Sequence, residues 1–294
     1  MLISESIREA FPFSVDKFKL VGPENIPTTH FGLFRSDKTD STSCVGRAVK
    51  KNYVPHTTDD VSALAEAATT LFGGQHEIKC HWRDGHIVSM RPPKEFRLSV
   101  YGTADNVYPV LNINAGYDGQ AFSANIGFFR DVCRNMSRMK FVEGTTTRIR
   151  HDSNLRDKMD VLIQDFQTLQ AGWDNLKAYI QRMEQTPILI GEFLDQIYGQ
   201  PEPNAPQRAV TIHKNRTTDI LTRLIREQGQ TGRPTITAGG TASAWMLTNA
   251  ISGYAQHTKT RKAGNDNEFD RIILANEDAE FIKAQTIVHS LMTV

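Results

Sequence analysis

The sequence predicts an α+β protein, with an N-terminal antiparallel sheet and helices followed by an all-helical C-terminal part with a long heptad-patterned helix. Three observations predict this class. Alternating apolar runs joined by Asp-Gly pairs fill the first half of the chain. Apolar residues at helical spacing fill the second half. One stretch there keeps a 3.5-residue period over about four heptads, which is typical of helix-on-helix packing.

The composition is that of an ordinary globular protein. Of the 294 residues, 39% are hydrophobic and 23% are charged, and the net charge is +1. No global field therefore draws the chain to nucleic acid or to a membrane, so such binding would need a local patch. The sequence has no apolar run of about 18 residues and no secretory signal at its start. Three widely spaced cysteines favour a reducing compartment, so we expect a cytoplasmic protein.

The first half divides into a leader and a sheet domain. We expect residues 1–29 to be an irregular leader with one short helix near Ser4–Ala10, because prolines interrupt them, and residues 30–150 to form the sheet domain. Thr57 starts a helix that Gly73 ends. Asp84-Gly85 is a hairpin turn, and a second turn lies at 116–119 between two further strands. The other expected strands are at 30–34, 44–49, 76–82, 86–90 and 96–102.

After Gly127 the spacing of apolar residues becomes helical and predicts a helix to Lys140. Three arginines recur every fourth residue there, which places them on one helix face. Between residues 130 and 150 six cations face two acids, a local net charge of +4 in a chain whose total is +1. The cations are Arg130, Arg134, Arg138, Lys140, Arg148 and Arg150.

Residues 151–294 are expected to form the helical domain, with a linker near 199–207. Its first helix carries the heptad seam from Leu155 to Met183. Two arrangements stay open: a helical hairpin within one chain, which we prefer because later helices can pair with it, and a coiled-coil oligomer. The helix at 241–257 is rich in small residues, which allow close backbone approach, and is placed in the core.

Motifs for cofactor chemistry are absent from the sequence. It has neither GxxxxGK[ST] nor GxGxxG, so we expect no ATPase or dinucleotide site and no cofactor. His76, Cys80 and His81 lack the second pair that a zinc site needs, so no metal site is expected. Asp118 and His151 are the only weak catalytic candidates, for metal-assisted or acid–base hydrolysis. The turn already explains Asp118, since Asp-Gly suits positive φ.

Three stretches resemble the phage/plasmid-like protein family catalogued as domain of unknown function 932. They are VGRAVKKNYVPHTTDDVSAL, then GYDGQAFSANIGFFRDVCRNMSRM followed by RIRHD, then TASAWMLTNAISGYAQH. The family patterns N-x-H/Y-D-G, F-R-x-V-C-x-N, R-H and N-A-x-x-x-Y-x-x-H correspond to 114–119, 129–135, 150–151 and 249–257. At the turn this chain has Tyr117 where the family often has His. The resemblance implies a phage or mobile-element origin and a role in DNA metabolism in the host cytoplasm.

These observations favour a phage-encoded accessory protein of DNA replication or recombination that binds nucleic acid, single-stranded rather than duplex, without catalysis. The six cations would contact phosphates, and Tyr117 and Tyr53, beside Lys50-Lys51, would stack on bases. One alternative is a structural protein that binds a host or phage protein, or a second copy, through the long helix. The other is a metal-dependent nuclease or hydrolase.

Overall fold

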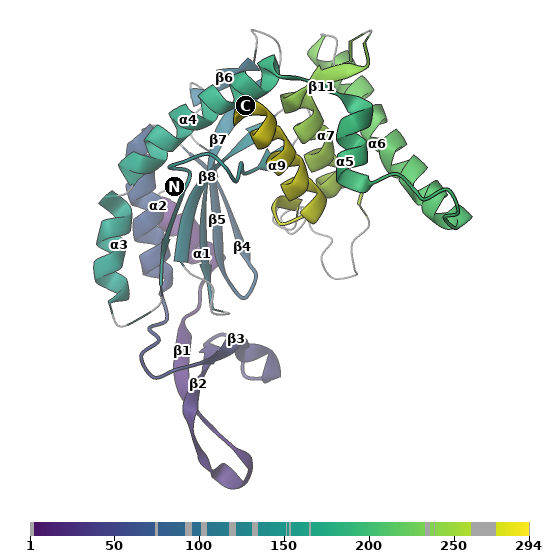
Figure 1. The fold of residues 1–294 in the computed structure, drawn as a ribbon. Coiled ribbons are helices and arrows are strands. Elements are labelled where there is room, and N and C mark those ends of the chain that lie inside the picture. The colour runs from purple at the N-terminus through teal and green to yellow at the C-terminus, as the bar shows by residue number, and fades with distance from the viewer. Residues whose placement is uncertain are drawn as a thin grey trace. The chain divides into compact units, whose positions relative to one another are not determined.

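The structure is a computed structural model with a mixed α/β fold and antiparallel sheets (Figure 1). Two compact units interleave along the sequence. Unit 1 comprises Met1–Phe96, Pro109–Ile126 and Glu143–Trp173, and unit 2 comprises Arg97–Tyr108, Gly127–Val142 and Asp174–Val294. The structure describes residues 3–73, 76–91, 96–100, 105–117, 122–130, 135–150, 152, 154–164, 166–232, 236–237, 239–259 and 275–293.

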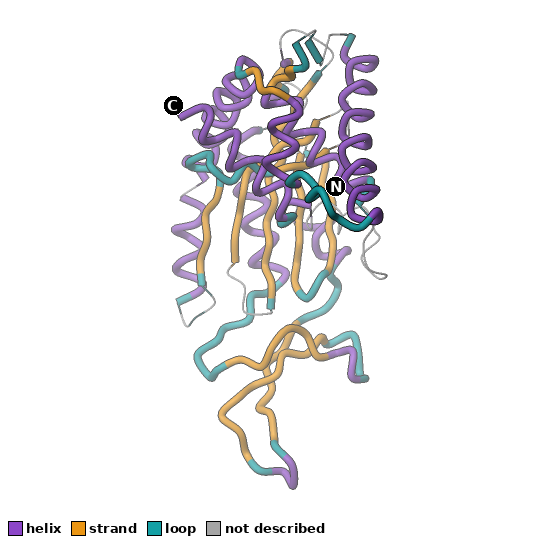
Figure 2. The backbone as a smooth tube through the Cα atoms, turned by 45° about the vertical axis from the view of Figure 1, so that its right-hand side comes forward, coloured by secondary structure: helices purple, strands orange, loops and turns teal. Residues whose placement is uncertain are grey.

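Unit 1 contains a small antiparallel sheet in the order β1 (Val15–Val21), β2 (Pro27–Arg35) and β3 (Cys44–Val49). Its strands can be followed in Figure 2. One end is held by an apolar cluster in which Phe13, Phe31, Tyr53 and Trp82 pack against buried residues. These buried residues are Val15, Leu33, Val45, Val49 and Tyr117. The strands therefore have a buried base, while Phe18, Val21 and Ile26 lie exposed further along them.

The short helix expected near Ser4–Ala10 is confirmed, but the expectation that the rest of the leader is irregular is wrong. Residues 1–29 contain helix α1 (Ile3–Ala10), strand β1, a single 3₁₀ turn at Pro23–Asn25 and the start of β2. The prolines do not prevent this order, because they lie at turns and at the first residue of β2, where no ladder hydrogen bond is lost. Ile7 and Phe11 are buried, so this segment belongs to the packed core of unit 1.

The larger sheet has seven antiparallel strands, in the order β10-β8-β7-β5-β4 with β6 beside β7 and β9 beside β8. The strands are β4 (Glu77–Trp82), β5 (Gly85–Arg91), β6 (Leu98–Ser99), β7 (Asn106–Gly116), β8 (Phe122–Arg130), β9 (Asn135–Ser137) and β10 (Thr146–Ile149). The predicted hairpin at Asp84-Gly85 is confirmed, and Asp84 has φ 48° there. A Cβ on Gly85 would lie 2.4 Å from the carbonyl oxygen of Ala115, so only glycine lets β5 and β7 approach.

The helix predicted after Gly127 is wrong, because β8 continues to Arg130 and β9 follows at Asn135–Ser137. The apolar residues there fit a two-residue period as well as a helical one. In β8 the side chains of Phe122, Ala124, Ile126, Phe128 and Arg130 are all fully buried, which is strand alternation. The cations of this stretch therefore do not form a row on a helix.

Helix α2 (Thr58–Phe72) begins as predicted, since Thr57 and Asp60 form a capping box and Gly73 ends it. The heptad stretch forms α3 (Leu155–Gln164) and α4 (Phe166–Gln185). Its described seam residues are at most 5% exposed in the single chain: Leu155, Met159, Leu169, Trp173, Leu176, Ile180 and Met183. The seam thus packs within its own chain and is not available to a coiled-coil partner.

The C-terminal part of unit 2 is mainly helical but not entirely so. Its helices are α5 (Ile190–Tyr198), α6 (Gln207–Thr231), α7 (Ala244–His257) and α9 (Ala279–Thr293). Strands β11 (Pro187–Leu189) and β12 (Thr241–Ser243) pair antiparallel between them. The described residues of α7 are buried up to Gln256, which confirms its predicted place in the core. Within the described residues, no helix has the length and hydropathy to cross a membrane.

Candidate functional site

The cations of the predicted nucleic-acid site lie in different environments. Arg130 is fully buried in β8, and Arg138 is half-buried, with its backbone N–H donating to Asn276. Lys140 is exposed on a turn. Arg148 and Arg150 are exposed at β10. Arg134 lies outside the described residues, as do both weak catalytic candidates, Asp118 and His151. A buried Arg130 cannot reach a phosphate in this conformation.

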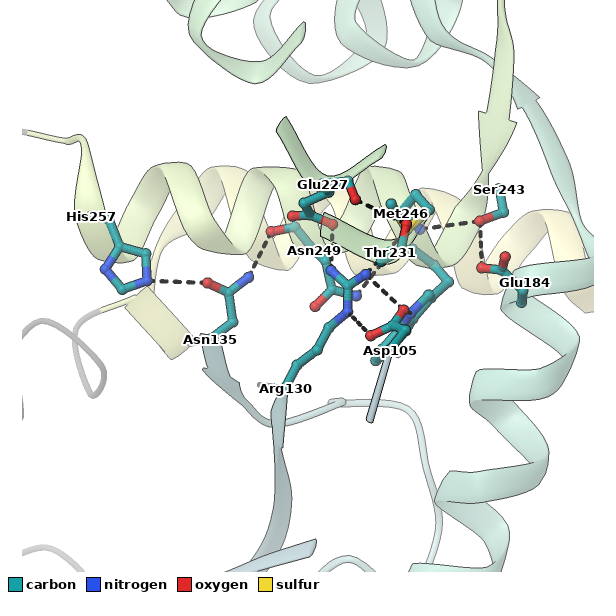
Figure 3. A network of polar contacts seen from close by, with 11 residues as sticks. Asp105, Arg130, Asn135, Glu184, Glu227, Thr231, Ser243, Met246, Asn249 and His257 are labelled. Atoms are coloured by element: carbon teal, nitrogen blue, oxygen red, sulfur yellow. Dashed lines mark hydrogen bonds and ion pairs between the residues drawn. The ribbon is translucent and has the colours of Figure 1, made fainter. Parts of the chain in front are cut away.

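Arg130 instead forms the centre of a buried ion network in unit 2 (Figure 3). Its Nε and Nη2 donate to the two carboxylate oxygens of Asp105, at 2.6 and 2.7 Å. Its Nη1 donates to Glu227 of α6. The indole Nε1 of Trp245 donates to Asp105 at 3.3 Å. The bidentate geometry is the strongest form of an arginine–carboxylate pair, so the network fixes these elements to each other.

The network holds two carboxylates against one guanidinium without exposure to water. The side chains of Arg130 and Asp105 are 0% exposed, and that of Glu227 is 5% exposed. Burial raises the pKa of the Glu227 carboxyl above its usual range, although Arg130 opposes this change. A buried charge triad contributes little net stability when intact, but removing one member leaves an uncompensated charge.

A second chain of contacts continues from β9 to α7 (Figure 3). The side-chain amide of Asn135 donates to the backbone carbonyl of Asn249 at 2.9 Å. A ring nitrogen of His257 lies 3.2 Å from the amide oxygen of Asn135. Ser137 and Ser252 share a hydrogen bond of 2.6 Å between their hydroxyls. The side-chain amide of Gln256, on the next turn of α7, donates to both serines.

The two family-like motifs therefore meet in space. F-R-x-V-C-x-N supplies Arg130 and Asn135, and N-A-x-x-x-Y-x-x-H supplies Asn249 and His257. Arg130 binds Asp105 and Glu227, while Asn135 contacts Asn249 and His257. Across the described residues, no group of three His, Cys, Asp or Glu side chains could hold a metal ion. The arrangement is that of a structural framework.

Sequence reasoning missed the partners of Arg130. Nothing near Asp105 in the sequence singles it out, and its pairing is with a residue 25 positions away. Glu227 did carry a readable signal, because the buried stripe of α6 is Ile220, Leu224, Glu227 and Thr231. An acid on the apolar stripe of a helix indicates a buried ion pair.

A second buried cluster lies in unit 1 around the predicted stacking residue Tyr117. Tyr117 is fully buried, stacks on His56 with ring centroids 4.2 Å apart, and donates its hydroxyl to the His56 carbonyl at 2.6 Å. His56 and His86 share a hydrogen bond of 2.9 Å between ring nitrogens. Burial, aided by the charge of Arg35, lowers the pKa of His86 to about 3. Tyr117 is thus a core residue, and a nucleic-acid base cannot stack on its buried ring.

Cys80 lies half-buried in β4, as the sequence indicated. Burial raises the pKa of its thiol to about 11, so the thiol stays protonated and unreactive near neutral pH.

The exposed face that combines cations with aromatic rings is on the small sheet. From Val15 to Lys51 seven cations face four acids, a net charge of +3. Phe18 on the edge strand β1 is 58% exposed, and its ring meets that of Phe34 edge-on at 5.9 Å. Lys17 donates to the backbone carbonyls of Lys51 and Tyr53 at 2.8 and 2.7 Å, which holds the 50–53 segment beside β1.

We call this surface the β1 rim and define it as Phe18, Lys19, Phe34, Lys50 and Lys51. Phe18 and Lys19 point to opposite faces of β1, but β1 is the edge of its sheet, so both faces can be reached from one side. Lys19, Lys50 and Lys51 are exposed, while Phe34 is half-buried. The rim keeps the predicted Lys50-Lys51 spot and adds an exposed aromatic ring, Phe18, that was not among the predicted site residues.

Comparison with known proteins bears on the family. No curated protein and no solved structure gives a match to this chain. A family model described as Domain of unknown function (DUF932) matches residues 47–274, which is more than half of the chain and includes both motifs of the buried network. The chain therefore belongs to the DUF932 family.

Proposed function

We propose that the protein is a phage-encoded accessory protein of DNA metabolism that binds single-stranded DNA along the β1 rim, without catalysis, in the host cytoplasm. The observation that carries the proposal is Phe18, an aromatic ring 58% exposed on an edge strand whose neighbourhood is rich in cations. Single-strand binding commonly combines a cationic track for phosphates with aromatic side chains on which bases stack. The rim carries both, with the Phe18 ring on one face of β1 and Lys19 on the other, along the exposed edge of the sheet.

The charge distribution supports single-stranded DNA as the ligand. The chain as a whole has a net charge of +1, whereas residues 15–51 carry +3. Arg35 and Asp37 pair with each other and so leave the net charge unchanged, and Asp40 caps the turn at Thr42. Lys19, Lys50 and Lys51 remain exposed for phosphate contacts. Bases in a single strand are free to stack, so an exposed ring such as Phe18 favours it over duplex.

The test is a fluorescence anisotropy titration of a labelled oligothymidylate at low salt. The wild-type protein should bind with an affinity that falls as salt rises, because phosphate contacts release counterions. Phe18→Ala should weaken binding about 5-fold to 150-fold, as expected for about 1–3 kcal/mol of stacking. Lys50→Glu with Lys51→Glu should weaken binding and reduce the salt slope. Absence of wild-type binding at low salt would refute the proposal.

Matched controls separate the site from general effects. Arg208→Glu with Arg226→Glu makes the same charge change at exposed positions of α6 and should leave affinity within twofold. Ile225→Ala removes an apolar side chain that is 61% exposed elsewhere and should also have no effect. Cleavage of the oligonucleotide on addition of Mg²⁺ or Mn²⁺ would favour the alternative of a metal-dependent nuclease.

A further inference from the structure

Unit 2 contains a pocket of about 490 Å³ bordered by α5, α6 and the segment before β12. This volume lies within the range of small-molecule sites, which is about 300–1,000 Å³. The described lining includes the aliphatic side chains of Ile190, Leu194 and Leu221 and the polar side chains of Asp195, Gln200 and His213. The pocket lies in unit 2 and shares no residue with the β1 rim of unit 1, so the inference below does not depend on the proposed function.

A small number of polar groups face this apolar space. The Nε2 of His213 is buried and has no hydrogen-bond partner among the described residues. A buried polar atom that makes no hydrogen bond is costly, commonly by about 1–3 kcal/mol. Asp195 accepts one hydrogen bond, from the side-chain amide of Gln200 at 2.6 Å, and a carboxylate has acceptor capacity for several more. His213 and Asp195 therefore offer hydrogen bonds to a ligand.

The charges of the lining select the kind of ligand. Among the described lining residues Asp195 is the one acidic side chain, and none is lysine or arginine. A phosphate or carboxylate would meet a carboxylate there with no cation to offset it, so an anionic group is disfavoured. A neutral molecule with N–H donors is favoured, since these can donate to Asp195.

The walls carry aliphatic side chains from two helices. Ile190 and Leu194 are carried on α5, and Leu221 is carried on α6, so aliphatic side chains from two helices border the space. Enzymes that extrude a base read its edge by hydrogen bonds and hold its faces between apolar or aromatic side chains. A nucleobase has the N–H donors for Asp195 and a ring nitrogen or amine for His213.

We infer that this pocket binds the base of an uncharged nucleoside, with the ring between the α5 and α6 side chains and its polar edge on Asp195 and His213. A larger side chain at Gly191 can fill the pocket without disturbing the fold. A Cβ built there meets nothing within 4 Å, and the residue lies inside α5, where leucine is a better helix former than glycine.

The test is saturation-transfer NMR and calorimetry of the full chain with adenosine, and with cyclohexanol as an apolar probe. Adenosine should bind saturably. Gly191→Leu should abolish this binding, and His213→Leu should weaken it at least 10-fold. Gly191→Ala is the matched control, because it adds little volume. No variant should unfold at a lower temperature than the wild type, and oligothymidylate binding should be unchanged in all of them.

Three outcomes would overturn the inference. Adenosine might fail to bind the wild-type chain, or it might bind Gly191→Leu as tightly as the wild type, which would place it elsewhere. If cyclohexanol binds as tightly as adenosine and His213→Leu has no effect on either, the pocket is only an apolar cavity. Loss of oligothymidylate binding by Phe18→Ala bears on the β1 rim alone, so the two proposals fail separately.

Discussion

Replacing Arg130 by methionine tests the buried network most sharply. The variant keeps an unbranched apolar side chain of similar length but removes the charge that Asp105 and Glu227 share. The side chains of Arg130 and Asp105 are 0% exposed and that of Glu227 is 5% exposed, so water cannot replace the lost partner. Removing one partner of a buried ion pair costs about 3–5 kcal/mol. A domain is commonly stable by about 5–15 kcal/mol, so much of the stability of unit 2 would be lost.

The assay is urea denaturation of the full chain, followed by tryptophan fluorescence, since Trp245 lies in the network. We expect the transition of unit 2 to move to lower urea by an amount equivalent to about 3–5 kcal/mol. Arg130→Lys should fall between the wild type and methionine, because lysine keeps the charge but not the bidentate geometry. A loss below about 1 kcal/mol for Arg130→Met would refute the reasoning that the charges are fully desolvated.

Three other predictions concern acid–base groups and packing. Because the pKa of Glu227 is raised, the folded chain binds a proton at this carboxyl more tightly than the unfolded chain does. The group therefore contributes stability at low pH, and this stability is lost as the pH rises through the folded-state pKa. Glu227→Gln should remove that pH dependence in denaturation curves measured upward from about pH 4.5. The pKa of His86 is lowered to about 3 in the folded chain, whereas that of an unfolded histidine is about 6.5. Neutral His86 therefore contributes stability above about pH 6.5 that is lost as the pH falls towards 3. His86→Asn should reduce this loss of stability at acid pH in the same assay. Gly85→Ala should lower the thermal midpoint by several degrees, as a Cβ there lies 2.4 Å from the Ala115 carbonyl oxygen, whereas Gly191→Ala should not lower it.

Each of these has a contrary result. Parallel pH curves for the wild type and Glu227→Gln would show that burial does not perturb this carboxyl. An unchanged acid limb in His86→Asn would assign acid sensitivity to other groups. An unchanged midpoint in Gly85→Ala would mean that β5 and β7 can separate at this hairpin without cost.

The sequence predicted those helices, caps and turns that depend on residues close together in the chain. The capping residues before α2, the Asp84-Gly85 turn and the heptad period each depend on residues close in the chain, and all three lie in the elements expected. The same heptad pattern did not tell an intramolecular seam from a coiled coil, because the period is identical in both. Only the burial of the seam in a single chain separates them.

The failures came from distant partners. Arg130 was interpreted as part of an exposed cationic helix, because charge is common on surfaces. Its partners, Asp105 and Glu227, lie 25 and 97 residues away, and no local pattern reports them. Phe18 was missed because residues 1–29 were expected to be an irregular leader, so no strand was predicted around it. The small sheet leaves it exposed because β1 is an edge strand.

The central claim is that single-stranded DNA lies on the β1 rim. Ultraviolet crosslinking of an oligothymidylate to the wild-type chain, followed by mass spectrometry of the peptides, tests it most directly. The account predicts a nucleotide attached to the peptide that contains Phe18, and its loss in Phe18→Ala. Crosslinks confined to other segments, such as the one around Arg148 and Arg150, would contradict it.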